Sequence, residues 1–287
     1  MKILKTGALL ILLSVLLVIA GNALAGPTGM KIALAFAVLM NGISYFFSDK
    51  IALMSSGAKP VTREQLPRLY MVMERLAGKA GLPVPKLYII PEPAPNAFAT
   101  GRNPNHASVA VTQGLLELMN DEELEGVIAH ELSHVRNYDI LTSSIAATIA
   151  GAITYLAHAA QWGMIFGGYG GRDDDRDRGG IGAIAMIILA PIAAVILQLF
   201  LSRTREYSAD ETGARMVGQP YGLISALQKL GAYNKRIATT AMAPATAALC
   251  IVQPFFGLGG LSSLFSTHPP LEDRIAALRE MSVVPQR

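Results

Sequence analysis

Four long segments without Asp, Glu, Lys or Arg decide what kind of fold this 287-residue chain can adopt. They cover residues 6–30, 32–48, 140–166 and 181–202. A helix needs roughly 20 apolar residues to cross a bilayer core about 30 Å thick, so each segment is a candidate span. The second segment is short and requires Lys31 to snorkel to the interface. Only 16% of the residues are charged, against about a quarter in soluble domains. We therefore predict an integral membrane protein.

The distribution of basic residues predicts the orientation of these spans. Twenty Lys and Arg residues fall on one side of the membrane: Lys2 and Lys5, nine in residues 49–139 and nine in residues 203–287. The other side has four, namely Lys31, Arg172, Arg176 and Arg178. Because positively charged loops stay in the cytoplasm, both larger pieces should be cytoplasmic. The Asp-rich sequence "GGYGGRDDDRDRGG" between the last two spans is typical of a flexible, solvated turn.

Two apolar stretches admit a second interpretation. The N-terminus also resembles a secretory signal, with Lys2, Lys5 and a cleavage-like Ala23-Leu24-Ala25, but its apolar run is long and another hydrophobic segment follows immediately. Residues 245–265 form a fifth apolar stretch, which Gln253, Pro254 and "GLGG" interrupt. We interpret it as a loop or a flap on the membrane surface. The predicted cytoplasmic side is the same with or without signal cleavage.

The two cytoplasmic pieces show short strands and amphipathic helices. The sequence "VTREQLPRLYMVMERLAGKAGLP" predicts a helix that Thr62 caps and Gly81 ends. "PKLYII" and "ASVAVT" predict strands, and "NAFATG" between them a turn. A further helix should follow Asn120, with acidic residues in its first turn. The predicted fold is a mainly α membrane protein with a small β-sheet, four transmembrane helices and a cytoplasmic α+β catalytic domain that a membrane hairpin splits.

The predicted organisation therefore has four parts. They are an N-terminal membrane hairpin (1–48), a first catalytic part (49–139), a second membrane hairpin (140–202) and a second catalytic part (203–287).

The sequence "HELSH" places a metal-binding pattern on the helix after Asn120. Residues four apart lie on one face of a helix, so His130 and His134 can share one zinc ion. Glu131 lies beside them, where a base can take a proton from the attacking water without being a ligand itself. The single cysteine, Cys250, excludes a Cys-rich zinc site, so the other ligands must be histidine or carboxylate.

A zinc hydrolase needs a third protein ligand. The remaining histidines are His106, His158 and His268. The predicted helix "SRTREYSADETGARMV" offers Glu206 and Asp210, two like charges four apart that destabilise a helix unless a cation lies between them. We predict Glu206 as the third ligand and Asp210 as the acceptor for the other N–H of a ligand histidine. The alternative is that these acids pair with Arg203, Arg205 or Arg215 on a solvated surface.

The four motifs "HELSHVRNYD", "SRTREYSAD", "NAFATG" and "STHPPLEDRI" together resemble the HtpX family of membrane zinc metalloproteases, relatives of the CAAX prenyl proteases. The resemblance covers essentially the whole chain. It implies a zincin-type catalytic domain, with Glu206 of "REY" as third ligand and Asp210 of "AD" beside it. The Asp-rich external loop is not part of the pattern.

The resemblance also implies roles for weaker signals. Residues Asn96, Ala97, Phe98 and Ala99 would form the edge that holds an extended substrate, although alone they indicate only a turn and a strand. His268 would stabilise the oxyanion, although alone it is typical of a helix start ahead of two prolines. Asp139 is expected to steady the end of the zinc helix.

The predicted function is that of a zinc endopeptidase, with one Zn²⁺ per chain, in the bacterial cytoplasmic (inner) membrane. Its expected partners are protein substrates, membrane proteins among them, and the lipid bilayer, with no nucleic acid. The resemblance implies stress-related quality control of damaged or misfolded membrane proteins. Alternatives are a site-specific processing peptidase of the CAAX type, or a membrane scaffold or transporter with structural zinc and an intramembrane His158. Glu131 distinguishes a peptidase from a protein with structural zinc, because a structural site needs no free base.

Overall fold

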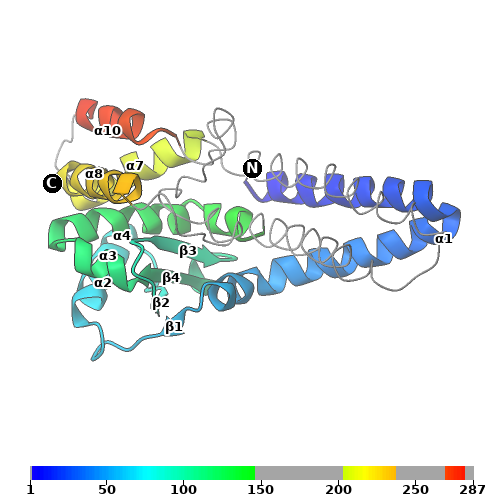
Figure 1. Ribbon diagram of the computed structural model, residues 1–287, viewed down its shortest axis with the longest axis horizontal. Helices are drawn as coiled ribbons and strands as arrows, with labels where there is room; N and C mark the ends of the chain where they lie inside the picture. The colour runs from blue at the N-terminus through cyan, green and yellow to red at the C-terminus, as the bar shows by residue number, and fades with distance from the viewer. Residues whose placement is uncertain (1, 146–202, 237–268, 282–287) are drawn as a thin grey trace.

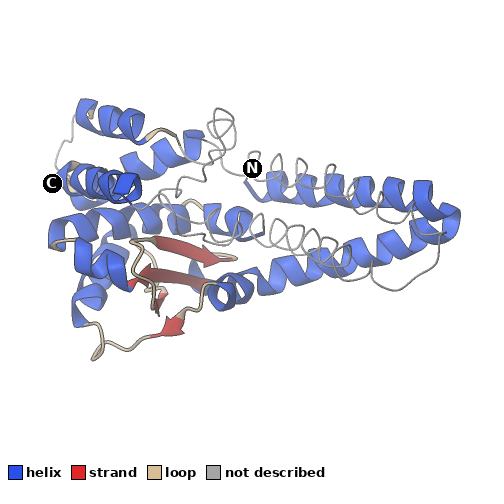
Figure 2. Cartoon of the chain, in the orientation of Figure 1, coloured by secondary structure: helices blue, strands red, loops and turns tan. Residues whose placement is uncertain are grey.

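The computed structural model describes residues 2–145, 203–236 and 269–281. Most of the predicted second membrane hairpin, the fifth apolar stretch, His158 and His268 lie outside these residues. The described part combines a long N-terminal helical region with a small sheet and a group of helices (Figures 1 and 2).

Helix α1 (Lys2–Ser55) folds back on itself, and its two arms run side by side (Figure 1). Gly26 has a φ of +59°, outside helical values, and Pro27 follows it, so the reversal falls at this pair. Asn41 Nδ2 donates to Ser14 Oγ across the arms at 2.9 Å. The second arm thus begins at the Gly-Pro pair, ahead of Lys31, the charge that separates the first two apolar segments.

The second arm is long enough to cross a bilayer. Among the described residues, Gly26–Ser55 is the one helical segment with the length and hydropathy of a membrane span. Its 30 residues correspond to about 45 Å of helix. This exceeds the hydrocarbon core of a bilayer, so the end of the arm can continue beyond the membrane.

Beyond α1 the chain forms a four-stranded mixed sheet with the order β1-β2-β4-β3. The strands are β1 (Lys59–Pro60), β2 (Lys86–Ile90), β3 (Ala97–Gly101) and β4 (Ala107–Thr112). β2 and β4 are parallel, whereas β1 pairs with β2 and β3 with β4 in antiparallel fashion. The strands predicted at "PKLYII" and "ASVAVT" are confirmed. The turn predicted over "NAFATG" was wrong, since these small residues form edge strand β3 by pairing with β4.

Six helices accompany the sheet within the described residues, besides α1 and the short 3₁₀ turn η1 (Pro104–His106). They are α2 (Pro67–Ala80), α3 (Gln113–Leu118), α4 (Asp121–Arg136), α7 (Arg203–Val217), α8 (Tyr221–Arg236) and α10 (Leu271–Glu280). α4 is central and contacts α2, α7, α8 and β3. The residues at 139–145, immediately after α4, are again helical.

Helix ends follow local sequence signals in most cases. α4 starts after Asn120, as the sequence predicted. Asn120 and Glu123 form a reciprocal capping box at this start. Gly81 ends α2 in the left-handed conformation, with a φ of 66°. The cap predicted at Thr62 was wrong, because α2 begins at Pro67, whose fixed φ suits the first helical turn.

The two faces of the sheet have different partners. One face and helices α2, α4 and α8 share the main apolar core, which includes Leu76, Val109 and Leu132. On the other face, Ala52 and Leu53 at the end of α1 pack with Ile90, Phe98 and Ala110. The second arm of α1 therefore continues directly onto the sheet beside edge strand β3.

Candidate active site

The two histidines of α4 point toward one place. Their Nε2 atoms lie 3.3 Å apart, and their rings are perpendicular. His130 is 1% exposed and His134 is partly buried. The regular helix that the capping box starts is what places these residues, four apart, on the same face.

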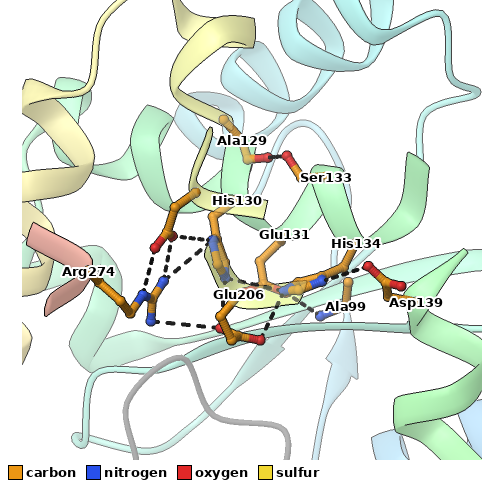
Figure 3. A network of polar contacts seen from close by, with 10 residues as sticks. Ala99, Ala129, His130, Glu131, Ser133, His134, Asp139, Glu206 and Arg274 are labelled. Atoms are coloured by element: carbon orange, nitrogen blue, oxygen red, sulfur yellow. Dashed lines mark hydrogen bonds and ion pairs between the residues drawn. The ribbon is translucent and has the colours of Figure 1, made fainter. Parts of the chain in front are cut away.

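Glu206 of α7 completes the group (Figure 3). Its Oε2 lies 3.6 Å from His130 Nε2 and its Oε1 lies 3.6 Å from His134 Nε2. One ligand atom from each of the three residues falls within 4.8 Å of the others, so the group can bind one metal ion. α7 approaches α4 this closely at Gly213, where an added Cβ would lie 3.0 Å from the backbone nitrogen of His130.

Two carboxylates contact the far nitrogens of the histidines. Asp210 Oδ1 lies 2.8 Å from His130 Nδ1, and Asp139 Oδ2 lies 3.5 Å from His134 Nδ1. Tyr138, with a φ of 60°, makes the sharp bend after α4 that brings Asp139 back toward the site. A proton held on each Nδ1 leaves both Nε2 lone pairs directed at the same point.

Arg274 of α10 is the site residue that the sequence analysis missed. It is fully buried and donates to both oxygens of Asp210, at 2.8 and 2.6 Å. Its Nη1 also lies 3.8 Å from Glu206 Oε2. A signal was present, because Arg274 shares a helical face with Leu271, Ile275 and Leu278 and therefore had to be buried.

The two predicted site acids of α7, Glu206 and Asp210, are both buried and do not lie on a solvated surface. Asp210 pairs with Arg274, and Arg215 pairs with Glu211 one turn along α7. Asp210 is therefore part of a buried network.

Glu131 is held by the edge strand. Its side chain is buried, with 4% exposed, and its Oε2 accepts the backbone N–H of Ala99 at 2.7 Å (Figure 3). Burial raises the pKa of Glu131 to about 7, although the nearby His134 lowers it. A carboxyl group with a pKa near neutrality can both accept and return a proton at physiological pH.

The surroundings shift the pKa values of the two histidines in opposite directions, and only His130 is shifted toward its neutral form. Burial lowers the pKa of His130, and this outweighs the opposing effect of Asp210. Burial alone would raise the pKa of Asp210, but Arg274 holds it below its ordinary value. The pKa of His134 is raised, because Asp139 and Glu206 outweigh the effect of burial. Two imidazole nitrogens and one carboxylate oxygen are a donor set that fits zinc.

The remaining predicted residues lie along β3 or outside the described residues. Asn96 precedes β3 and is anchored to β4, since its N–H donates to Thr112 Oγ1 at 2.8 Å. Ala97, Phe98 and Ala99 are in β3 at the sheet edge nearest α4. His268 lies outside the described residues, and its role stays a prediction.

Comparison with known proteins identifies the family. The family described as Peptidase family M48 matches residues 63–282, which is most of the chain. The chain belongs to peptidase family M48. A "Protease HtpX homolog" of Desulfatibacillum aliphaticivorans is 57% identical over 274 residues, covering 96% of this chain and 88% of the relative. One of Syntrophotalea carbinolica is 51% identical over 99% of this chain and 100% of the relative.

The fold also has a solved counterpart. The crystal structure of S. mikatae Ste24p matches with a TM-score of 0.51 at 20% identity, covering 92% of this chain and 61% of that one. This likeness concerns the fold alone. The resemblance to HtpX-type proteases is confirmed by the full-length relatives. This M48 peptidase is a membrane metalloprotease whose substrates are proteins.

Proposed function

We propose that this M48 peptidase is a zinc-dependent endopeptidase that works at the cytoplasmic surface of the bacterial inner membrane. The observation that carries the proposal is the convergence of His130, His134 and Glu206 on one point, with Glu131 beside them and not among them. A purely structural zinc site fills all four positions with protein ligands and has no use for an adjacent base.

Zinc held by these three residues would polarise the scissile carbonyl and lower the pKa of water, which is the chemistry that the metal supplies. Glu131, which is held beside the three ligands by the N–H of Ala99, accepts the proton of the attacking water and then delivers it to the leaving amine. Asp210 and Asp139 hold the histidine rings in the required tautomer. We assign the stabilisation of the oxyanion to His268.

Strand β3 provides the binding edge for an extended substrate. In its register with β4, Phe98 is opposite Ala110. The backbone N–H and C=O groups of Ala97 and Ala99 point to the outer side, away from β4. A substrate segment that adds as a further strand would place its backbone next to Ala99 and therefore next to Glu131. We propose Asn96–Ala99 as the substrate-binding segment on this basis.

The proposed topology has four spans, with the catalytic domain divided by the second membrane hairpin. We place residues 1–48 and 140–202 in the membrane and residues 49–139 and 203–287 in the cytoplasm. The support is the strong excess of Lys and Arg in the latter two ranges. It also includes α1, which continues from its apolar arm onto the sheet.

Damaged or misfolded membrane proteins are the proposed substrates, in stress-related quality control. The support is the short connection between the site and both membrane segments. The last turn of α1 packs on β3, and the helical residues 139–145 begin three residues after α4 ends. A site so close to the bilayer meets segments that emerge from it.

The test compares detergent-purified wild type with Glu131→Gln and Glu206→Ala, measuring zinc content and cleavage of casein. Glu131→Gln should retain zinc and lose cleavage, whereas Glu206→Ala should lose zinc. Glu122→Gln, an exposed Glu in the first turn of the same helix, is the matched control and should behave as wild type. Full cleavage by zinc-loaded Glu131→Gln would refute the proposal.

A further inference from the structure

Two backbone N–H groups on the outer side of β3 donate hydrogen bonds, one to Glu131 of α4 and one to Ser144. In the register with β4, the backbone groups of Ala97, Ala99 and Gly101 face outward. The N–H of Ala99 donates to Glu131, and the N–H of Gly101 donates to Ser144 Oγ at 3.4 Å. One contact therefore belongs to the catalytic machinery, whereas the other comes from the helical residues at 139–145.

Ser144 also contacts a side chain of β3. Its Oγ lies 2.7 Å from Thr100 Oγ1, and both residues have 0% exposed surface. A buried hydroxyl that loses its partner keeps its desolvation cost, so this pair resists separation. The helical residues at 139–145 follow the bend at Tyr138 and lead toward the predicted third span. The Thr100–Ser144 pair thus ties the edge strand to the helical residues that precede the predicted third span.

The inner side of β3 is held by its pairing with β4 over all five residues, and the strand is buried. Ala97, Ala99 and Gly101 have little or no side chain, and Phe98 packs on Ala52 and Leu53 of α1. Within the part of the chain that the structure describes, no strand pairs with the outer edge of β3. On the outer side, the Gly101 end is held by Ser144 in addition to its pairing with Ala107 of β4.

We propose that Ser144 is a positioning residue for substrate binding. It fixes the Gly101 end of β3 through Thr100, so that the outward backbone groups of Ala97 and the outward carbonyl of Ala99 are aligned before an extended substrate arrives, while the N–H of Ala99 stays on Glu131. Ordering the strand in advance lowers the entropy lost on binding. The inference rests on the proposed function, because it assigns Ser144 to the substrate edge of the same site. Ser144 belongs to neither the metal-binding group nor the proton-transfer step.

The experiment measures KM and kcat of the full-length, zinc-loaded protein with a fluorogenic peptide that contains a mapped casein cleavage site. Ser144→Ala should raise KM about fivefold, the change expected if substrate binding must supply about 1 kcal/mol to order a strand that Ser144 no longer orders in advance. We expect kcat within twofold of wild type and unchanged zinc content. Ser144→Thr keeps the hydroxyl and should restore most of the affinity. Thr100→Val removes the same pair from the strand side and should reproduce the rise in KM.

Ser225→Ala is the matched control, because Ser225 lies on α8 and its Oγ contacts Glu123 of α4 at 2.6 Å, so it removes a serine hydroxyl contact that does not involve β3. Wild-type KM in this control supports the inference, whereas an equal rise in KM would reduce the effect to general destabilisation and overturn it. Wild-type KM in both Ser144→Ala and Thr100→Val, or loss of zinc from Ser144→Ala, would also overturn it. Failure of the wild-type protein to cleave the peptide would instead count against the proposed function.

Discussion

Replacing Arg274 with methionine should destabilise the protein strongly, because it breaks a buried ion pair from one side. The guanidinium has no exposed surface and makes two hydrogen bonds of 2.6 and 2.8 Å to Asp210. Methionine removes the charge and leaves Asp210 buried without its cation. Breaking a buried pair in this way costs about 3 to 5 kcal/mol. The expected loss in free energy of unfolding therefore lies in this range.

The assay is thermal and denaturant unfolding of the detergent-purified, metal-free protein. Arg279→Met is the control on the same helix, where the side chain is exposed, and it should change stability by less than about 0.5 kcal/mol. Adding Asp210→Asn to Arg274→Met should recover part of the loss, because the unpaired buried charge is then removed. A loss below about 1 kcal/mol in Arg274→Met, or no recovery in the double variant, would refute the reasoning.

Three further predictions concern the contacts around the site. Gly213→Val should push α7 away from the backbone of His130, cost about 1 to 3 kcal/mol and weaken zinc binding in a chelator competition. Asp139→Asn should lower zinc affinity about tenfold to a hundredfold in the same competition, because it weakens the contact with His134 Nδ1. Burial opposes ionisation of Glu123, but its hydrogen bonds hold its pKa below the ordinary value. Its stabilising contribution is therefore present above about pH 4.3 and is lost as the pH falls through the folded-state pKa. The free energy of unfolding of metal-free Glu123→Gln should be lower than that of the wild type at pH 7, and this difference should be smaller at pH 3.

Local signals predicted much of the fold. The capping residue Asn120, the spacing of His130 and His134 and the alternating "ASVAVT" each act within a few residues, so the sequence alone placed α4 and β4 correctly. The second helix with Glu206 and Asp210 was likewise found at α7. These elements are consistent with their own propensities and need no tertiary contact to be recognised.

The structural features that the sequence did not reveal depend mostly on contacts between residues far apart in the chain. Ala97–Gly101 has small residues with weak strand propensity, and only pairing with β4 makes it a strand. Arg274 pairs with Asp210, which lies 64 positions earlier in the chain, and no local pattern encodes this pairing. The first two charge-free segments meet at Lys31, but the reversal of α1 lies at Gly26, where the Gly-Pro pair sets it. Glu131 was correctly singled out, but its contact with Ala99 required the packing of α4 against the sheet edge.

X-ray absorption spectroscopy at the zinc edge of the purified protein tests the central claim most directly. Two imidazole nitrogens and carboxylate oxygen are expected around one zinc ion per chain, at about 2.0 to 2.2 Å, and Glu206→Ala should change or abolish this shell. An identical zinc shell in Glu206→Ala, or a spectrum of the wild type without two imidazoles, would contradict the account that α4 and α7 together hold the metal.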